Sequence, residues 1–275
     1  MAKAKELEDL DLVVKAALYQ GIPKGVRQIE GTLSVKFGVQ MNHKKIHRIM
    51  RKYKIYCPVR PEKPYKGMTN TVLHRTFDNA VNRNFNNGLA RTILLTDITY
   101  IHYDGGNKLC YLSTIKDAAT HEILAHKVST SMSVDLVLDT IDNLVKLHHH
   151  ELNTNNQIYL HSDQGSQYTS LSYQNRLEIE NILCSMSRRG NCHDNAPQES
   201  FFGHMKDELF DTLLKTKRYD IVEGLLDNYM DYYNNERIQE SLLKLTPSEY
   251  YNYLFTKKYP YREVLGISMK EITKE

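Results

Sequence analysis

The stretch that decides the fold is "TILLTDITYIHY", residues 92–103. Its β-branched, aromatic and aliphatic side chains predict a buried strand. Asp97 interrupts the apolar run in the middle of that strand. Aspartate is disfavoured inside strands, so an acid at this position indicates a chemical role more than a structural one. The sequence on either side has to supply the partners for that carboxylate.

Apolar patterns after this stretch predict a single α/β domain. Further strands are expected at 108–118, 121–129, 157–163 and 182–187, with helices at 134–145, at 170–181 and from about 194 onward. A meander followed by right-handed crossovers gives a mixed sheet of five strands with helices on both faces. In that sheet the first and fourth strands are parallel neighbours, because the chain returns beside its first strand.

Two further acids are placed to meet Asp97. Asp163 ends the fourth strand in "YLHSDQGSQYTS", residues 159–170, and Glu199 lies in the first turns of the last helix. Ligands of open α/β sheets bind at the carboxyl ends of strands, near a switch in strand order. Three carboxylates there suit Mg²⁺ or Mn²⁺, and two such ions roughly 4 Å apart act on phosphodiesters.

Each acid taken alone also has a simpler interpretation. Asp163 before Gln-Gly suits a turn, and Glu199 in a first helical turn complements the helix dipole. Asp117, at the end of the second strand, is a rival acid that its position does not exclude. Glu208, farther along the last helix, is expected to face solvent. The choice among these acids therefore depends on the whole set.

The amino-terminal segment predicts a small helical module of the helix-turn-helix type. Gly38 ends one helix, and Asn42 is suited to cap the next. From residue 44 to residue 66, nine lysines and arginines face a single acid. Lys45, Arg48 and Lys52 share a polar face of the helix, which suits DNA phosphates. The simpler alternative is a solvated helix followed by a soluble linker.

Proline every third residue from Pro58 to Pro64 predicts an extended connector after this module. The predicted organisation is a helix-turn-helix-like module at 1–57, a basic linker rich in Pro and Asn at 58–90, a core at 91–213 and a helical extension at 214–275.

Composition narrows the class of protein but does not identify a partner. The chain has 275 residues, 25% of them charged, and a net charge of only +3. Its four cysteines form no repeating pattern, which is typical of reduced thiols in the cytoplasm. The first thirty residues lack a signal peptide, and no apolar run approaches the length of a membrane span. We therefore expect a protein that works in solution inside the cell.

Four motifs in order closely resemble those of insertion-sequence transposases whose catalytic core is of the retroviral-integrase type. They are "TDITYI", "LHSDQGSQYTS", "SMSRRGNCHDNAPQESFFGHMKDEL" and "YYNNERIQESLLKLTPSEY". More narrowly, the chain resembles the second-frame product of bacterial elements with two reading frames. The resemblance implies a ribonuclease-H-like fold and an Asp-Asp-Glu triad at Asp97, Asp163 and Glu199. It also implies two divalent cations, for strand cleavage and strand transfer at the ends of a mobile element.

The same resemblance implies further residues at the DNA. Lys206 shares a helix face with Glu199 and is placed against DNA, while Ser162, Gln164 and Gly165 shape the loop beside the second acid. The approach to the third acid is lined by Arg188, Arg189, Asn191 and Asn195.

The implied partners are terminal inverted repeats, target DNA and a second copy of the chain, in the nucleoid of a bacterial cytoplasm. An upstream-frame protein, or a frameshift fusion with it, is a further implied partner, and a membrane is not. Two other functions stay open: a DNA-binding regulator or inactive relic, and a nuclease on the same fold that cuts without joining.

Overall fold

The computed structural model describes residues 2–57, 77–82, 85, 88–152, 156–188 and 195–261. Contacts between Cα atoms divide the chain into two compact units. The first comprises Met1–Arg60, Asp207–Leu209 and Asp231–Glu275, and the second comprises Pro61–Lys206 and Phe210–Met230. The expected division into four segments stays a prediction, and residues 58–76 of the expected linker lie outside the described part.

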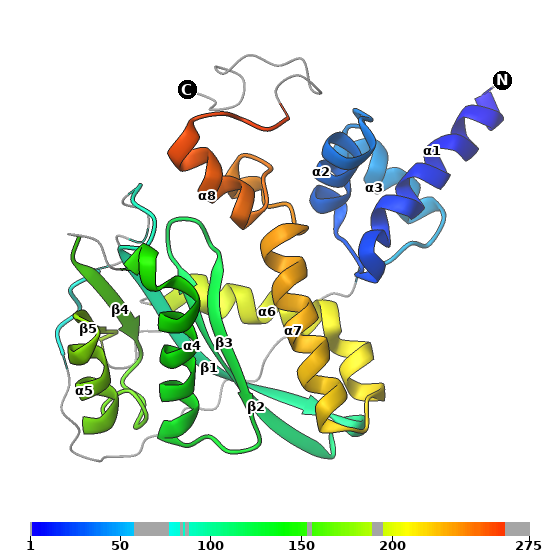
Figure 1. The fold of residues 1–275 in the computed structure, drawn as a ribbon. Coiled ribbons are helices and arrows are strands. Elements are labelled where there is room, and N and C mark those ends of the chain that lie inside the picture. The colour runs from blue at the N-terminus through cyan, green and yellow to red at the C-terminus, as the bar shows by residue number, and fades with distance from the viewer. Residues whose placement is uncertain are drawn as a thin grey trace. The chain divides into compact units, whose positions relative to one another are not determined.

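The second unit is built on one mixed sheet (Figure 1). Its strands are β1 (Ile93–Tyr103), β2 (Lys108–Asp117), β3 (Ile123–Ser129), β4 (Ile158–Ser162) and β5 (Ile182–Met186). The strand order is β3-β2-β1-β4-β5, with β1 antiparallel to β2 and parallel to β4. The predicted five-stranded mixed sheet and the predicted pairing of the first and fourth strands are both confirmed.

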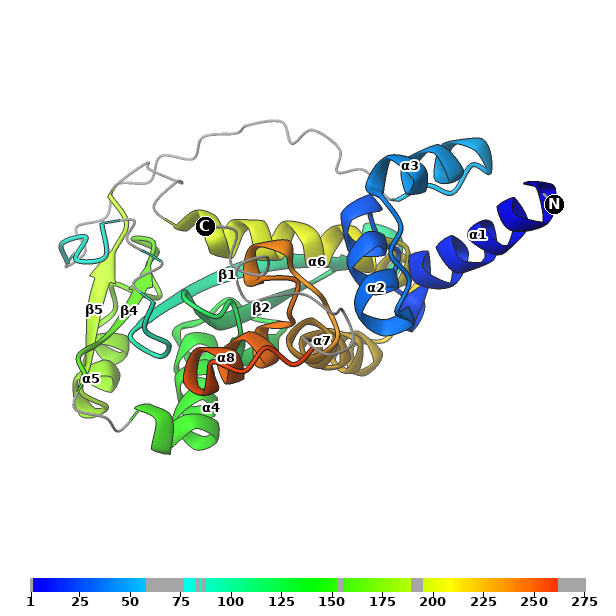
Figure 2. The ribbon, with the colours of Figure 1, turned by 90° about the horizontal axis from the view of Figure 1, so that it is seen from above.

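Helices cover both faces of this sheet. They are α4 (Val134–Leu152), α5 (Leu171–Ile179), α6 (Ala196–Lys215) and the part of α7 (Tyr219–Asn235) that ends at Met230. α4 and α5 lie on one face and α6 on the other (Figure 2).

Alternation along the strands explains which side chains meet which helices. Leu94 and Ile115 point into the apolar core that α4 and α5 share, where they pack with Ile141 and Leu177. The next side chain along β1 or β2 points to the other face, toward α6. Asp97 is therefore on the α6 face of the sheet.

The first unit is helical, and its description as a helix-turn-helix-like module stays a prediction. Its helices are α1 (Ala2–Ala17), α2 (Val26–Phe37), α3 (His43–Lys52) and α8 (Pro247–Thr256), together with the end of α7. Gly38 ends α2 in the left-handed conformation, at φ 66°, and the Asn42 side chain accepts a hydrogen bond from the N–H of Lys44 at 2.8 Å. The predicted helix stop and the predicted cap are confirmed. Nowhere in the described chain is a helix both long and apolar enough to cross a membrane.

Arg237 and Ile238, which follow α7, contact other segments of the first unit. Arg237 forms an ion pair of 2.8 Å with Glu208, and each side chain is only 9% exposed. The expectation that Glu208 faces solvent is therefore wrong, because a distant arginine folds back onto it. Ile238 packs closely against Gly31, where an added Cβ would lie 3.1 Å from its side chain.

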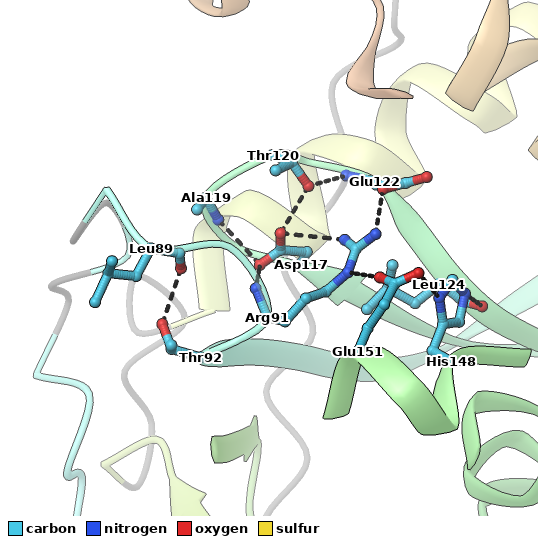
Figure 3. A network of polar contacts seen from close by, with 10 residues as sticks. All are labelled: Leu89, Arg91, Thr92, Asp117, Ala119, Thr120, Glu122, Leu124, His148 and Glu151. Atoms are coloured by element: carbon cyan, nitrogen blue, oxygen red, sulfur yellow. Dashed lines mark hydrogen bonds and ion pairs between the residues drawn. The ribbon is translucent and has the colours of Figure 1, made fainter. Parts of the chain in front are cut away.

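A buried ion network ties the start of β1 to the end of β2 (Figure 3). Arg91 reaches Asp117 at 3.3 Å, Glu122 at 2.7 Å and Glu151 at 2.5 Å. Asp117 is fully buried, and it also accepts a hydrogen bond from the hydroxyl of Thr120 at 2.7 Å. It lies opposite Leu94, three residues before Asp97 along β1. Asp117 is thus a structural acid and not part of the candidate site.

Replacing Arg91 by methionine should strongly destabilise the protein. The change leaves Asp117 buried without its cation, which typically costs about 3–5 kcal/mol. Urea denaturation of Arg91→Met measures the loss in the free energy of unfolding. Arg218→Met is the matched control, because Arg218 pairs with Asp220 on the surface and such pairs contribute under about 1 kcal/mol. Equal losses in the two variants would contradict this assignment.

Candidate active site

The pairing of β1 with β4 brings the first two acids together. Leu95 lies opposite His161 in the parallel register, and two residues farther along both strands come Asp97 and Asp163. Neighbouring strands are about 4.8 Å apart. Because β4 ends at Ser162, Asp163 is the first residue beyond that strand. The two carboxylates therefore share one edge of the sheet.

The third acid is carried by the first turn of α6, which is fastened to β2. Glu199 lies in that turn and is exposed. The ammonium group of Lys116 donates a hydrogen bond to the carbonyl oxygen of Pro197 at 3.0 Å and lies over the ring of Phe201. Lys116 is only 3% exposed, so this cation is enclosed between the sheet and the helix. It fixes the helix start over the strand beside Asp97.

Two buried amides add to this attachment. The Gln198 side chain donates a hydrogen bond to the hydroxyl of Thr114, which lies directly opposite Asp97 in the sheet. The Asn195 side chain donates to the carbonyl oxygen of Thr96 at 3.3 Å. The amide of Asn195, predicted to line the approach to Glu199, is thus used inside the protein to hold α6 on β1.

The pKa of Asp97 responds to the neighbouring acids. Burial and the negative charge of Asp163 raise the pKa of Asp97 to about 7, and the charge of Glu199 adds to this effect. A hydrogen bond of 2.8 Å from the N–H of Ile98 and the positive charge of Lys206 act in the opposite direction. Glu199 and Lys206 of α6 therefore both act on the carboxylate of β1.

Asp163 is held by the turn that follows it. Its Oδ1 accepts a hydrogen bond from the N–H of Gly165 at 2.8 Å. An added Cβ on Gly165 would lie 2.9 Å from the same oxygen, which is closer than real Cβ contacts. The pKa of Asp163 is raised, because partial burial disfavours its charged form. The hydrogen bond from Gly165 acts in the opposite direction and lowers the pKa. Glycine at 165 is required by this close approach.

The loop beside Asp163 is anchored to β5. The Gln164 side chain donates to the carbonyl oxygen of Ser187 at 3.1 Å. The ring of His161, fully buried, lies between the hydroxyls of Ser185 at 2.9 Å and Ser187 at 3.1 Å. Gln164, predicted to contact DNA, thus has a structural partner.

The other residues predicted to contact DNA differ in exposure and in their ion pairs. Arg188 is exposed just beyond β5, and Arg189 and Asn191 lie outside the described residues. In the first unit, Lys45 pairs with Asp9 at 2.6 Å and Lys52 pairs with Glu6, while Arg48 is exposed.

Thr114, Lys116 and Gln198 are site-supporting residues that the sequence reasoning missed. One signal was available, because a lysine inside the apolar strand "LSTIKDA" is as unexpected as the aspartate of the first strand. Its partner is a backbone carbonyl on α6, which no side-chain pattern reveals.

Comparisons with known proteins concern the chain as a whole. Two models described as "Integrase core domain" match residues 90–192 and 180–247. A putative transposase of insertion element IS150 from Escherichia coli K12 is 33% identical over 83% of this chain and 77% of its own length. A transposase-like protein of Haemophilus influenzae is 35% identical over 80% of this chain and 97% of its own length.

Structural comparison supports the same core. The chain matches one chain in a structure of the simian T-cell lymphotropic virus intasome in complex with PP2A regulatory subunit B56 gamma, with a TM-score of 0.50 and 14% identity. That match covers 76% of this chain and 66% of the other. At this identity it shows the fold alone, and the predicted ribonuclease-H-like class is confirmed.

Gly165→Ala should displace the carboxylate of Asp163. The added methyl group takes the space that Oδ1 occupies, and a misplacement of about 1 Å at a reacting centre can reduce rates about 100-fold. We expect cleavage of DNA to fall by at least about tenfold with little change in melting temperature. Gly224→Ala is the control, because an added Cβ there has nothing within 4 Å, and this variant should keep its activity. Equal activity of the two variants would contradict the proposed crowding at Asp163.

The free energy of unfolding of Asp97→Asn should increase relative to that of wild type as pH rises. The pKa of Asp97, about 7 in the folded state, exceeds the unfolded value near 3.9, so the folded state binds this proton more tightly. That stabilisation is complete below about pH 4 and is lost as pH rises through 7. In EDTA, the difference in the free energy of unfolding between the variant and wild type should therefore shift by about 2 kcal/mol in favour of the variant from about pH 5 to about pH 8.

Urea denaturation at the two pH values measures this gain. Asp220→Asn serves as the control, because Asp220 is an exposed acid paired with Arg218. Asp97→Asn and wild-type curves that stay parallel across this range would show that Asp97 titrates normally.

Proposed function

Because the chain belongs to the family of insertion-sequence transposases with an integrase core domain, we propose that it cleaves and joins DNA at the ends of a mobile element. The proposed chemistry takes place at Asp97, Asp163 and Glu199. One observation supports this assignment: the negative charges of Asp163, just after β4, and of Glu199, in the first turn of α6, both raise the pKa of Asp97 in β1. A purely structural core gains nothing from such a cluster of like charges.

The donor chemistry fits Mg²⁺ or Mn²⁺. Within the described residues, no three acid, histidine or cysteine side chains are close enough to enclose an ion. Magnesium rarely needs such a cage, because it usually keeps several waters and binds through one or two carboxylates plus substrate phosphates. Asp97 and Asp163 supply such a pair, and Glu199 is the proposed third ligand. Two ions would stabilise both the attacking and the leaving oxygen of the phosphodiester.

The protein's own contribution is to hold these carboxylates before DNA arrives. Backbone N–H groups fix one oxygen of Asp97 and one of Asp163, which limits their rotation. Lys206, on the same helix as Glu199, acts electrostatically on Asp97, and we propose that it binds a DNA phosphate beside the acids. Arg188 is proposed as a second cation at the approach.

The proposed DNA partners are the terminal inverted repeats and the target duplex. Joining two ends to one target requires two active sites, so we propose at least a dimer on DNA. A protein of the upstream reading frame, or a fusion with it, is the proposed source of any additional end recognition.

A strand-transfer assay on DNA carrying the element's ends tests this function. With Mg²⁺, wild type should join the ends to target DNA, and Glu199→Gln should lose at least about 100-fold of this activity while still binding DNA. A scrambled repeat is the substrate control, and Asp220→Asn is a surface control for the protein.

The alternatives give different results in the same assay. Cleavage without joining in wild type would support a nuclease. Specific binding without any chemistry would support a regulator or a relic, unless adding the upstream-frame protein restores joining.

A further inference from the structure

The helix α3 carries an exposed basic surface that the acid site does not use. The helix contains no acidic residue, and its apolar side is buried in the core of the helical module through Ile46, Ile49 and Met50. Its lysines and arginines surround the remaining part of the helix. They are Lys44, Lys45, Arg48, Arg51 and Lys52.

Two of these cations are already paired within the first unit. Lys45 contacts Asp9 of α1 at 2.6 Å, and Lys52 contacts Glu6 of α1. Glu6 and Asp9 are three residues apart and so share one face of α1. The hydrogen bond from Lys52 lowers the pKa of Glu6, as expected for an acid that keeps its charge beside a cation. The flank of α3 that faces α1 is therefore neutralised.

Three other cations of α3 lie outside the apolar core of the module. Lys44, Arg48 and Arg51 follow one another at four and three residues, which places them on a single stripe of a helix with 3.6 residues per turn. All three are exposed. Among the described residues, no carboxylate forms an ion pair with Lys44 or Arg51, and the charge of Arg48 is also felt by Glu6.

We propose that Lys44, Arg48 and Arg51 are the face of α3 that contacts the phosphates of double-stranded DNA, and that Lys45 and Lys52 instead hold α1 against α3. This inference rests on the proposed function, because it takes DNA as the partner. It replaces two of the three contacts that the sequence alone predicts on this helix.

Counterion release supplies the physical reason for this division. A cation that meets a phosphate releases a condensed counterion, and each contact steepens the dependence of log K on log salt by about 0.9. A lysine that already has a carboxylate must first break that pair, so its net contribution to DNA binding is small. Paired and unpaired cations on α3 should therefore contribute unequally to the affinity for DNA.

A matched pair of double variants of the full chain tests the proposal. Lys44→Gln/Arg51→Gln and Lys45→Gln/Lys52→Gln each remove two positive charges from α3. Fluorescence anisotropy with a duplex that carries the element's end gives the affinity from about 0.05 to 0.2 M NaCl. We expect the first variant to lower the slope by about 2 and the affinity at about 0.1 M by on the order of 50-fold. The second should change the slope by less than about 0.5.

Arg48→Gln should lower the slope by about 1. Thermal unfolding of each variant verifies that the helical module is folded. Equal slope changes in the two double variants, or a larger change for Lys45→Gln/Lys52→Gln, would overturn the proposal. A wild-type chain that binds no duplex at any salt would instead contradict the proposed function itself.

Discussion

The parallel register between β1 and β4 is the constraint on which the site depends. It sets Asp97 near Asp163, because two residues past the pair Leu95 and His161 the chain carries an acid in each case, Asp97 within β1 and Asp163 just after β4. A shift of one residue would turn one of these side chains to the opposite face of the sheet. The register is itself fixed by the apolar core on the other face, where Leu94 and Leu160 pack. The same strands thus pack the core on one face and carry the candidate site on the other.

Holding like charges together works against stability in the free protein. Burial and Asp163 raise the pKa of Asp97 to about 7, so the site binds a proton where a cation is proposed to bind. The surrounding structure withstands this repulsion through links that do not touch the reacting atoms. Hydrogen bonds of Lys116 and Gln198 hold α6 on β2. The ion pair of Arg91 with Asp117 links the start of β1 to the end of β2. Such supports are required wherever a site is preorganised for a charged ligand.

The first unit follows the same logic with opposite charges. Its helices carry many cations, and those that meet α1 are compensated by acids from that helix. Arg237 and Glu208 form a further compensated pair in the same unit, from segments far apart in the sequence. The cations of α3 that form no ion pair among the described residues, Lys44, Arg48 and Arg51, are the ones proposed to bind DNA. Whether a charge supports the fold or binds a ligand is decided by its neighbours in space.

Local patterns predicted the helices and strands, because strand and helix periods and caps are short-range features. The three candidate acids were singled out by their joint spacing and by the family resemblance, not by any one local pattern. Asp97 stood out inside an apolar strand, and Gly38 and Asn42 marked the turn before α3. The tertiary structure alone decided the partner of each charge. Asp117 met Arg91, Glu208 met Arg237, and Lys45 met Asp9. These pairs join residues about 26 to 36 positions apart. Only the folded chain brings them within the few ångströms at which charges interact strongly.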